Sequence, residues 1–337
     1  MLGTPHIADE LSNPRHGDAV RFQRTLLKST IFGGIFCSLT GSAAKADPIV
    51  ALTEQNSLIR FDSSAPGLLL GSNSITGLQS GERLLGIDFR PSNGELYGLS
   101  NDSRLFTLNP MTGRATFAVR LSTPLTTSSS YGIDFNPVDG QLRVVHSDAR
   151  IDPTSNQNLR VNADNGAVVV DERLHPIRVV SPLDPNIGAA SYTNNFFGAT
   201  STTLYDIDFF RDRLVLQNPE NSGTLVRVGE LAPSATPPIG GDITNQHVGF
   251  DISGISGIAF ASLTSPTTDI SSLYSVNLNT GAATDLGVIG DGLTVKSLAV
   301  PVTSPVPEPA TAQLLGMGIA SLGMLGLNQR MRNRKNE

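Results

Sequence analysis

One segment of this 337-residue chain occurs twice, 46 residues apart. Leu85–Tyr97 reads LGIDFRPSNGELY, and Tyr131–Arg143 reads YGIDFNPVDGQLR. Each copy is a short apolar run followed by a turn rich in Asn, Asp, Gly and Pro, residues that suit tight hairpins. This alternation predicts antiparallel strands joined by hairpins. A unit that recurs at this period restricts the chain to a repeat architecture.

The repeat predicts an all-β fold, because about 45 residues with four strands per unit is typical of a β-propeller. One unit is split between the two ends of the domain. Ile49–Asp62 aligns without a gap on Leu96–Asn109, and Thr294–Val300 forms a last strand without a unit of its own. We therefore predict a five-bladed β-propeller closed by pairing of its N- and C-terminal strands, since an open edge invites aggregation. Another all-β repeat architecture, such as a solenoid or a sandwich, is the alternative.

Residues 1–46 have the pattern of a signal peptide region. Basic residues precede the apolar run Thr30–Leu39, which contains Cys37, the chain's only cysteine. The small residues Ala44 and Ala46 then occupy the −3 and −1 positions of a cleavage site. We expect cleavage after Ala46, which leaves a mature protein without cysteine.

The other end of the chain carries a second address. A Pro-rich linker at residues 302–311 precedes an apolar segment at 312–327, a short transmembrane helix by its composition, and a basic tail at 328–337 expected to stay in the cytoplasm. The order of Pro307, Glu308 and Pro309, apolar segment and basic tail resembles the PEP-CTERM sorting signal of Gram-negative bacteria. The resemblance implies export through the Sec translocon, transient membrane insertion and processing by an exosortase. It places the protein in the cell envelope, on the cell surface or in the extracellular matrix.

The domain between these signals, residues 47–301, is acidic. It carries 15 Lys and Arg against 25 Asp and Glu, a net charge of −10. A domain without a basic stripe argues against nucleic acid as a partner. The chain also lacks Trp, which weakens a carbohydrate-stacking interpretation without excluding contacts through Tyr.

Several short motifs of this domain resemble the DUF4394 family of secreted bacterial domains of unknown function. The resemblance is carried by Gly86–Pro91, Leu96–Leu99, Gly132–Pro137, Leu142–Val145, Tyr192–Asn195 and Leu204–Asp208. It implies a propeller-like fold and brings no known catalytic residues.

Asp88, Asp134 and Asp251 recur on the first strand of three units. First strands line the channel of a propeller, so these acids are weak candidates for catalysis. Glycoside cleavage needs two carboxyl groups about 5–10 Å apart. The structural alternative is stronger: equivalent positions make a repeated hydrogen bond to N–H groups of a neighbouring turn, whereas a catalytic pair needs separated pKa values.

No cofactor is expected, with calcium as the open alternative. Acidic residues in or near loops supply the hard oxygen donors that calcium prefers, but no EF-hand or nonapeptide spacing is present. These acids are Asp152, Asp164, Asp171, Asp206 and Asp208. His146, His175 and His247 lie on different units without paired spacing, so no transition-metal site is predicted.

One long insertion, Leu174–Thr203, interrupts the repeat. Departures from a repeat often carry function, because regular positions are committed to packing. Its amide and aromatic side chains suit binding, namely Tyr192, Asn194, Asn195, Phe196 and Phe197. The alternative is that this segment only covers a blade edge.

Together these patterns predict an exported, exosortase-sorted propeller that is a non-catalytic binding or structural protein. A polysaccharide or a surface protein is the expected partner. The alternative is an extracellular glycan hydrolase or lyase that uses the carboxylates of the channel.

Overall fold

The computed structural model describes residues 46–126, 130–147, 156–177, 185–231 and 247–302. The chain divides into two compact units, Met1–Ala43 and Ala44–Glu337. The first unit lies outside the described residues, as do the predicted signal peptide and the segment at 312–327. Everything below therefore concerns the second unit.

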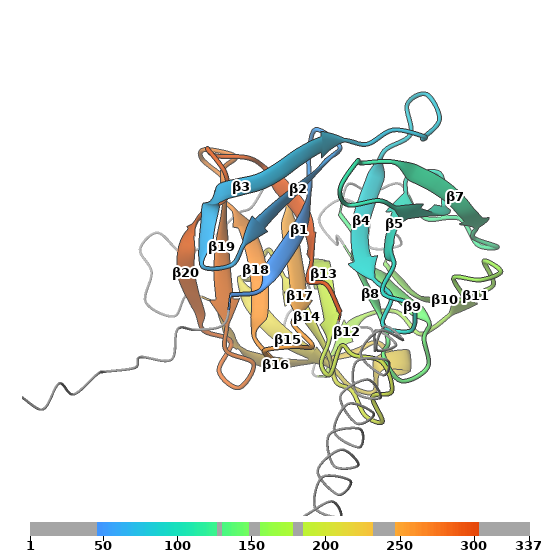
Figure 1. The fold of residues 1–337 in the computed structure, drawn as a ribbon. Helices are drawn as coiled ribbons and strands as arrows, with labels where there is room; N and C mark the ends of the chain where they lie inside the picture. Colours follow the sequence, from blue (N-terminus) through green and yellow to red (C-terminus); the bar gives the residue numbers. More distant parts are fainter. Residues whose placement is uncertain (1–45, 127–129, 148–155, 178–184, 232–246, 303–337) are drawn as a thin grey trace, which may run out of the picture. The chain divides into compact units, whose positions relative to one another are not determined.

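The strands of this unit form five sheets, which are the blades of a five-bladed propeller (Figure 1). From the innermost strand outward, the first four blades are β21 (Val295–Ala299), β1 (Pro48–Thr53), β2 (Ser57–Asp62) and β3 (Ala65–Ser74); β4 (Leu84–Phe89), β5 (Leu96–Ser100), β6 (Arg104–Leu108) and β7 (Ala115–Arg120); β8 (Gly132–Phe135), β9 (Leu142–His146), β10 (Gln157–Val161) and β11 (Val168–Val170); and β17 (Val248–Ile252), β18 (Ala259–Thr264), β19 (Ser271–Val276) and β20 (Ala283–Val288). Each of these four blades is antiparallel throughout.

The remaining blade has five strands because a short edge strand is added. Its meander is β13 (Ile187–Tyr192), β14 (Leu204–Asp208), β15 (Arg213–Gln217) and β16 (Thr224–Glu230), with a 3-10 turn at Glu220–Ser222. The two-residue strand β12 (His175–Pro176) pairs parallel to β16 at the outer edge. The predicted insertion at Leu174–Thr203 thus contains this edge strand, the innermost strand of the blade and the loop 193–203.

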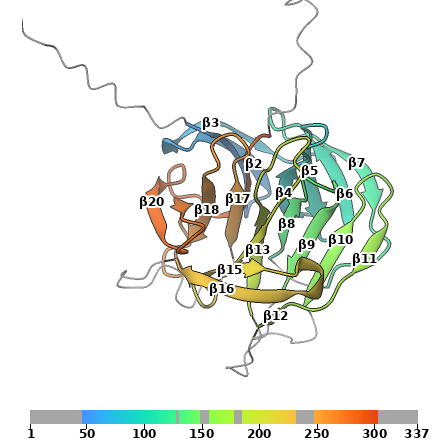
Figure 2. The same cartoon turned by 90° about the horizontal axis from the view of Figure 1, so that it is seen from below.

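The innermost strands β4, β8, β13, β17 and β21 contact one another in that order around the axis. Figure 2 shows β4, β8, β13 and β17 toward the middle and β3, β7, β11 and β20 on the outside. Inner strands are buried at every residue, as in β4, whereas outer strands such as β7 expose most of their residues. This gradient explains why the inner strands read as continuous apolar runs.

The ring closes through β21 and β1, the last and first strands of the propeller. They pair antiparallel, with Val50 opposite Ala299 and Ala51 opposite Leu298. The predicted five blades and their closure by terminal strands are therefore confirmed. Closure leaves no inner edge exposed for pairing with another chain.

Each gap between neighbouring blades is filled by its own apolar cluster. In one, Leu52 and Leu58 pack with Ile87 and Phe106. The other four clusters join the blades of β4 and β8, β8 and β13, β13 and β17, and β17 and β21. The stability of the ring thus rests on five separate interfaces.

Two glycines allow neighbouring inner strands to come close. A Cβ at Gly132 would lie 2.6 Å from the backbone nitrogen of Ala190, and one at Gly249 would lie 2.8 Å from that of Leu298. Both distances are too short for real atoms, so any side chain there would push two blades apart. The middle of the propeller is consequently narrow.

We predict that Leu298→Ala lowers the free energy of unfolding by about 2–5 kcal/mol, because it empties a buried position on the closing strand. Leu70→Ala is the matched control, since Leu70 is 60% exposed on β3 and its loss should cost less than about 0.5 kcal/mol. Urea unfolding of both variants measures the difference. Equal losses would mean that β21 is not packed into the ring.

Candidate functional site

Three of the five inner strands place an aspartate at the same depth in the propeller. Asp88, Asp134 and Asp251 each occupy the position before the last residue of their strand. Register places Ser191 at the corresponding position of β13, because it pairs with the second strand as Asp88 does. Register places Ala299 there in β21. This layer therefore contains three acids, one hydroxyl and one methyl group.

The three acids meet in the middle of the ring, as their repeated position predicted. One carboxylate oxygen from each lies within 4.8 Å of the others. Their residues are only 1–2% exposed. Among the described residues, this is the one group of His, Cys, Asp and Glu whose ligand atoms are close enough to hold a metal ion.

Hydrogen bonds tie two of these acids to the next blade. The Phe135 N–H donates to Asp88 Oδ2 at 2.7 Å, and the Val300 N–H donates to Asp251 Oδ2 at 2.6 Å. Ser191 plays the same part in its blade, since its Oγ accepts from the Ile252 N–H at 3.0 Å. The repeated hydrogen bond thus reaches the neighbouring inner strand, and not a neighbouring turn as the sequence suggested.

Asp134 is the exception in this pattern. Both of its carboxylate oxygens are buried and have no hydrogen-bond partner among the described residues. Ser191 and the Tyr192 N–H are near enough to lower its pKa, yet neither makes a hydrogen bond with ordinary geometry. An unpartnered buried carboxylate is costly, since burial removes its water without replacing it.

Burial raises the pKa of all three acids. The pKa of Asp88 and of Asp134 lies well above its ordinary value because of burial first, and then because of repulsion by neighbouring carboxylates. Burial raises the pKa of Asp251 to about 6, against the opposing effect of the Val300 and Ile252 N–H donors. The site therefore favours protons or a cation over three free negative charges.

Asn195, from the loop 193–203, approaches the same cluster. Its side chain is close enough to Asp251 to lower the pKa of that acid. Asn195 is fully buried, and neither atom of its amide group makes a hydrogen bond with ordinary geometry. The loop is held against the turn after β17, where a Cβ on Gly254 would lie 1.9 Å from the carbonyl oxygen of Asn195.

The other predicted binding residues are divided between the interior and the surface. Tyr192 is buried, and its hydroxyl donates to Glu220 Oε2 at 2.8 Å. Asn194 has a positive φ of 57° and donates from Nδ2 to the Ser201 carbonyl. Phe196 and Phe197 are 37% and 54% exposed. Only the two phenylalanines and Asn194 are thus available to a partner.

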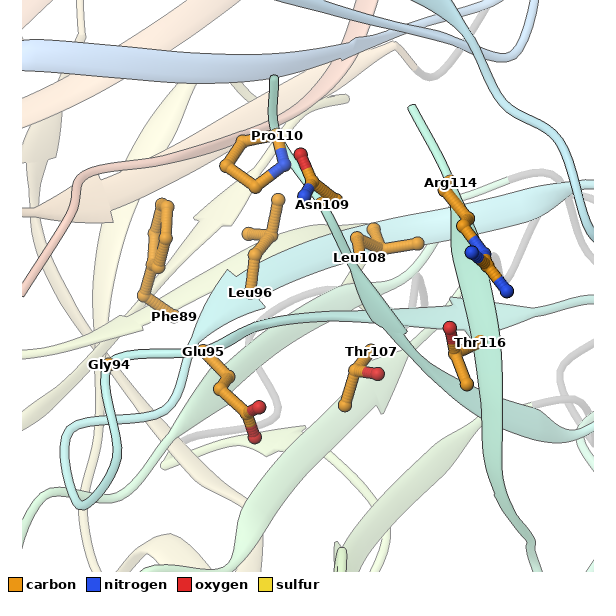
Figure 3. Close-up of a pocket in the computed structure, with 10 residues that line it drawn as sticks. All are labelled: Phe89, Gly94, Glu95, Leu96, Thr107, Leu108, Asn109, Pro110, Arg114 and Thr116. Carbon is orange, nitrogen blue, oxygen red and sulfur yellow. The ribbon is translucent and has the colours of Figure 1, made fainter. Parts of the chain in front are cut away.

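A separate pocket of about 410 Å³ lies on the blade that begins with β4 (Figure 3). Glu95, Thr107 and Arg114 contribute its polar side chains, and Leu96 and Leu108 are among its apolar lining. It contains none of the three channel acids and none of the predicted binding residues. The channel carboxylates are therefore not part of this pocket.

The acids considered for calcium in loops are held by basic residues and do not gather. Asp164 pairs with Arg90, Asp208 with Arg211, and Asp171 with two arginines. Asp206 is buried without a hydrogen-bond partner in the described part of the chain, and Asp152 lies outside it.

The three histidines also stay apart. The His146 ring packs 4.9 Å from the ring of Tyr131, while His175 is on the edge strand β12. His247 lies 3.7 Å from Glu54.

Sequence reasoning missed a buried arginine network next to the channel. The Arg143 side chain is fully buried and donates to Asn158, Asp171 and Asn221 at 2.7–2.8 Å. It also donates to the Tyr192 hydroxyl at 3.2 Å. A possible signal was the charged residue at the place that Tyr97 occupies in the first copy of the repeat.

This network holds two further acids. Burial opposes ionisation of Asp171, but hydrogen bonds from Arg160 and Arg143 bring its pKa below the ordinary value. Burial raises the pKa of Asp206 well above the ordinary value, and Arg143 reduces that rise. Arg143 thus compensates charge between the blades of β8 and β13.

We predict that Arg143→Ala lowers the free energy of unfolding by about 3–5 kcal/mol, because it leaves buried acids without their counter-charge. The control is Arg227→Ala, which breaks an exposed ion pair with Glu230 and should cost less than about 1 kcal/mol. Chemical denaturation measures both. A small loss for Arg143→Ala would show that the network contributes little to stability.

Comparison with known proteins adds the family. The domain described as "Domain of unknown function (DUF4394)" matches residues 57–299, well over half of the chain. The chain belongs to the DUF4394 family. The resemblance found in the sequence motifs is confirmed, and a search of curated proteins finds no match.

The PEP-CTERM protein-sorting motif matches residues 305–333, which include Pro307, Glu308 and Pro309. This motif marks a DUF4394 protein that is exported, sorted by an exosortase and located in the cell envelope or at the surface of a Gram-negative bacterium. In the residues that the structure describes, no helix is long and apolar enough to cross a membrane.

Solved structures resemble this DUF4394 protein only at low sequence identity. "Crystal structure of Nidogen/Laminin Complex" shares 11% identity with a TM-score of 0.43, covering 76% of this chain and 98% of that one. Kuenenia stuttgartiensis hydrazine synthase shares 13% with a TM-score of 0.36, covering 67% and 53%. A Bacteroides thetaiotaomicron protein of unknown function shares 12% with a TM-score of 0.38, covering 70% and 49%. The chain thus spans about half the length of the last two.

Proposed function

We propose that this exported DUF4394 protein is a non-catalytic binding module of the cell envelope or extracellular matrix. The observation that carries the proposal is the burial of Asp88, Asp134 and Asp251, which are 1–2% exposed. A glycan hydrolase must bring its acids to the substrate and give them separate roles. Acids sealed at equivalent positions of a repeat do not meet that need.

The proposed contact surface is the loop 193–203. Its two exposed phenylalanines, Phe196 and Phe197, stand beside Asn194. Aromatic rings supply a large contact area at low entropic cost, and stacking against a sugar or an aromatic side chain uses their faces. The proposed partner is a polysaccharide or a surface protein of the envelope.

The test uses the full-length protein and extracellular polysaccharide prepared from cultures of the producing bacterium. We expect the protein to sediment with the polymer without releasing reducing sugar. Replacing both rings (Phe196→Ala with Phe197→Ala) should weaken binding about tenfold or more, because two exposed aromatic contacts are lost. The melting temperature should stay unchanged.

Val138→Ala is the matched control, since Val138 is also exposed, at 48%, in a turn that follows an inner strand. Reducing sugar released by the wild-type protein, and lost in a folded Asp88→Asn variant, would overturn the proposal in favour of an enzyme. Unchanged binding by the double variant would remove the loop from the contact surface.

A further inference from the structure

We propose that Asp88, Asp134, Asp251 and the Ser191 hydroxyl together hold one calcium ion inside the propeller. The site is distinct from the surface loop proposed to bind a partner, and does not depend on it. The argument rests on the geometry of the cluster, on its unpartnered polar atoms and on the absence of a counter-charge.

The geometry suits an ion with oxygen ligands. Calcium binds carboxylate and other oxygens at 2.3–2.6 Å, so two ligands on opposite sides of the ion are about 5 Å apart. Three carboxylate oxygens that lie within 4.8 Å of one another can therefore all contact one such ion. Ser191 Oγ lies 3.2 Å from Asp251 Oδ1, so a neutral oxygen belongs to the same layer.

The unpartnered atoms point to a missing ligand. Asp88 and Asp251 each accept a strand N–H, but Asp134, in the same layer, accepts none with either oxygen. The fully buried amide of Asn195 next to Asp251 is also without an ordinary hydrogen bond. Buried polar groups are nearly always satisfied, so two such side chains beside one acidic cluster indicate a bound species between them.

The charge of the cluster indicates that this species is a cation. Within the described ranges, no Lys, Arg or His side chain forms an ion pair with any of the three acids. Elsewhere this chain does pair its buried acids, as Arg143 does for Asp171. The competing state of the cluster is three carboxyl groups that share protons, and an experiment separates the two.

Export supports calcium over other hard cations. Extracellular calcium-binding modules operate with dissociation constants of about 10⁻⁴–10⁻³ M. Magnesium demands a smaller, near-octahedral site and usually keeps several of its waters. A dry site built from three carboxylates at the middle of a ring favours the larger ion.

The experiment measures calcium directly on the full-length protein. After treatment with a chelator, calorimetric titration should show one calcium bound per chain. Saturating calcium should raise the melting temperature by about 5–10 °C, because it binds only the folded ring. The same concentration of magnesium should give a much smaller rise.

Asp134→Asn is the decisive variant. We expect it to lose about tenfold or more in calcium affinity, because one charged ligand is gone. Without calcium it should melt at or above the wild-type temperature, because it removes an unpartnered buried charge. A purely structural role for Asp134 would instead lower the melting temperature with and without calcium. Asp291→Asn, on an exposed turn, should leave both affinity and melting temperature unchanged.

Two results would overturn the proposal. One is a folded wild-type protein that binds no calcium by titration. The other is equal calcium binding by the wild type and Asp134→Asn, which would place the ion elsewhere. If Asp134→Asn does not fold, Asp88→Asn provides the same comparison, and the titration of the wild type still decides whether the ion binds.

Discussion

The closing pair of strands β21 and β1 is the constraint on which the rest of the structure depends. Without it, the blade of β1 would lack its innermost strand and two of the five apolar interfaces would open. Closure also fixes how near the inner strands lie, because Gly132 and Gly249 leave no room for a side chain. The same narrowness that stabilises the ring brings the channel carboxylates together.

This crowding has an electrostatic cost that the chain meets in two different ways. Between the blades of β8 and β13, the buried acid Asp171 is compensated by Arg143. In the channel, Asp88 and Asp251 are partly compensated by strand N–H groups, and Asp134 is not. A bound cation would complete the channel in the way that an arginine completes the neighbouring interface.

The repeat made the fold predictable, whereas the irregular parts of the site were not. Equivalent positions such as Asp88 and Asp134 converge in any closed propeller, so their meeting followed from the period alone. Asn195 and Arg143 lie outside the repeated pattern, and their partners are distant in sequence. The burial of Tyr192 likewise depends on Arg143 and Glu220, a contact that no spacing in the sequence encodes.

The most direct test of this account is a crystal structure of the protein grown with calcium, with anomalous diffraction recorded to locate the ion. The account predicts one anomalous peak inside the ring, about 2.3–2.6 Å from oxygens of Asp88, Asp134 and Asp251. A channel without such a peak, in which the three carboxyl groups are joined by short O–H···O hydrogen bonds, would contradict it.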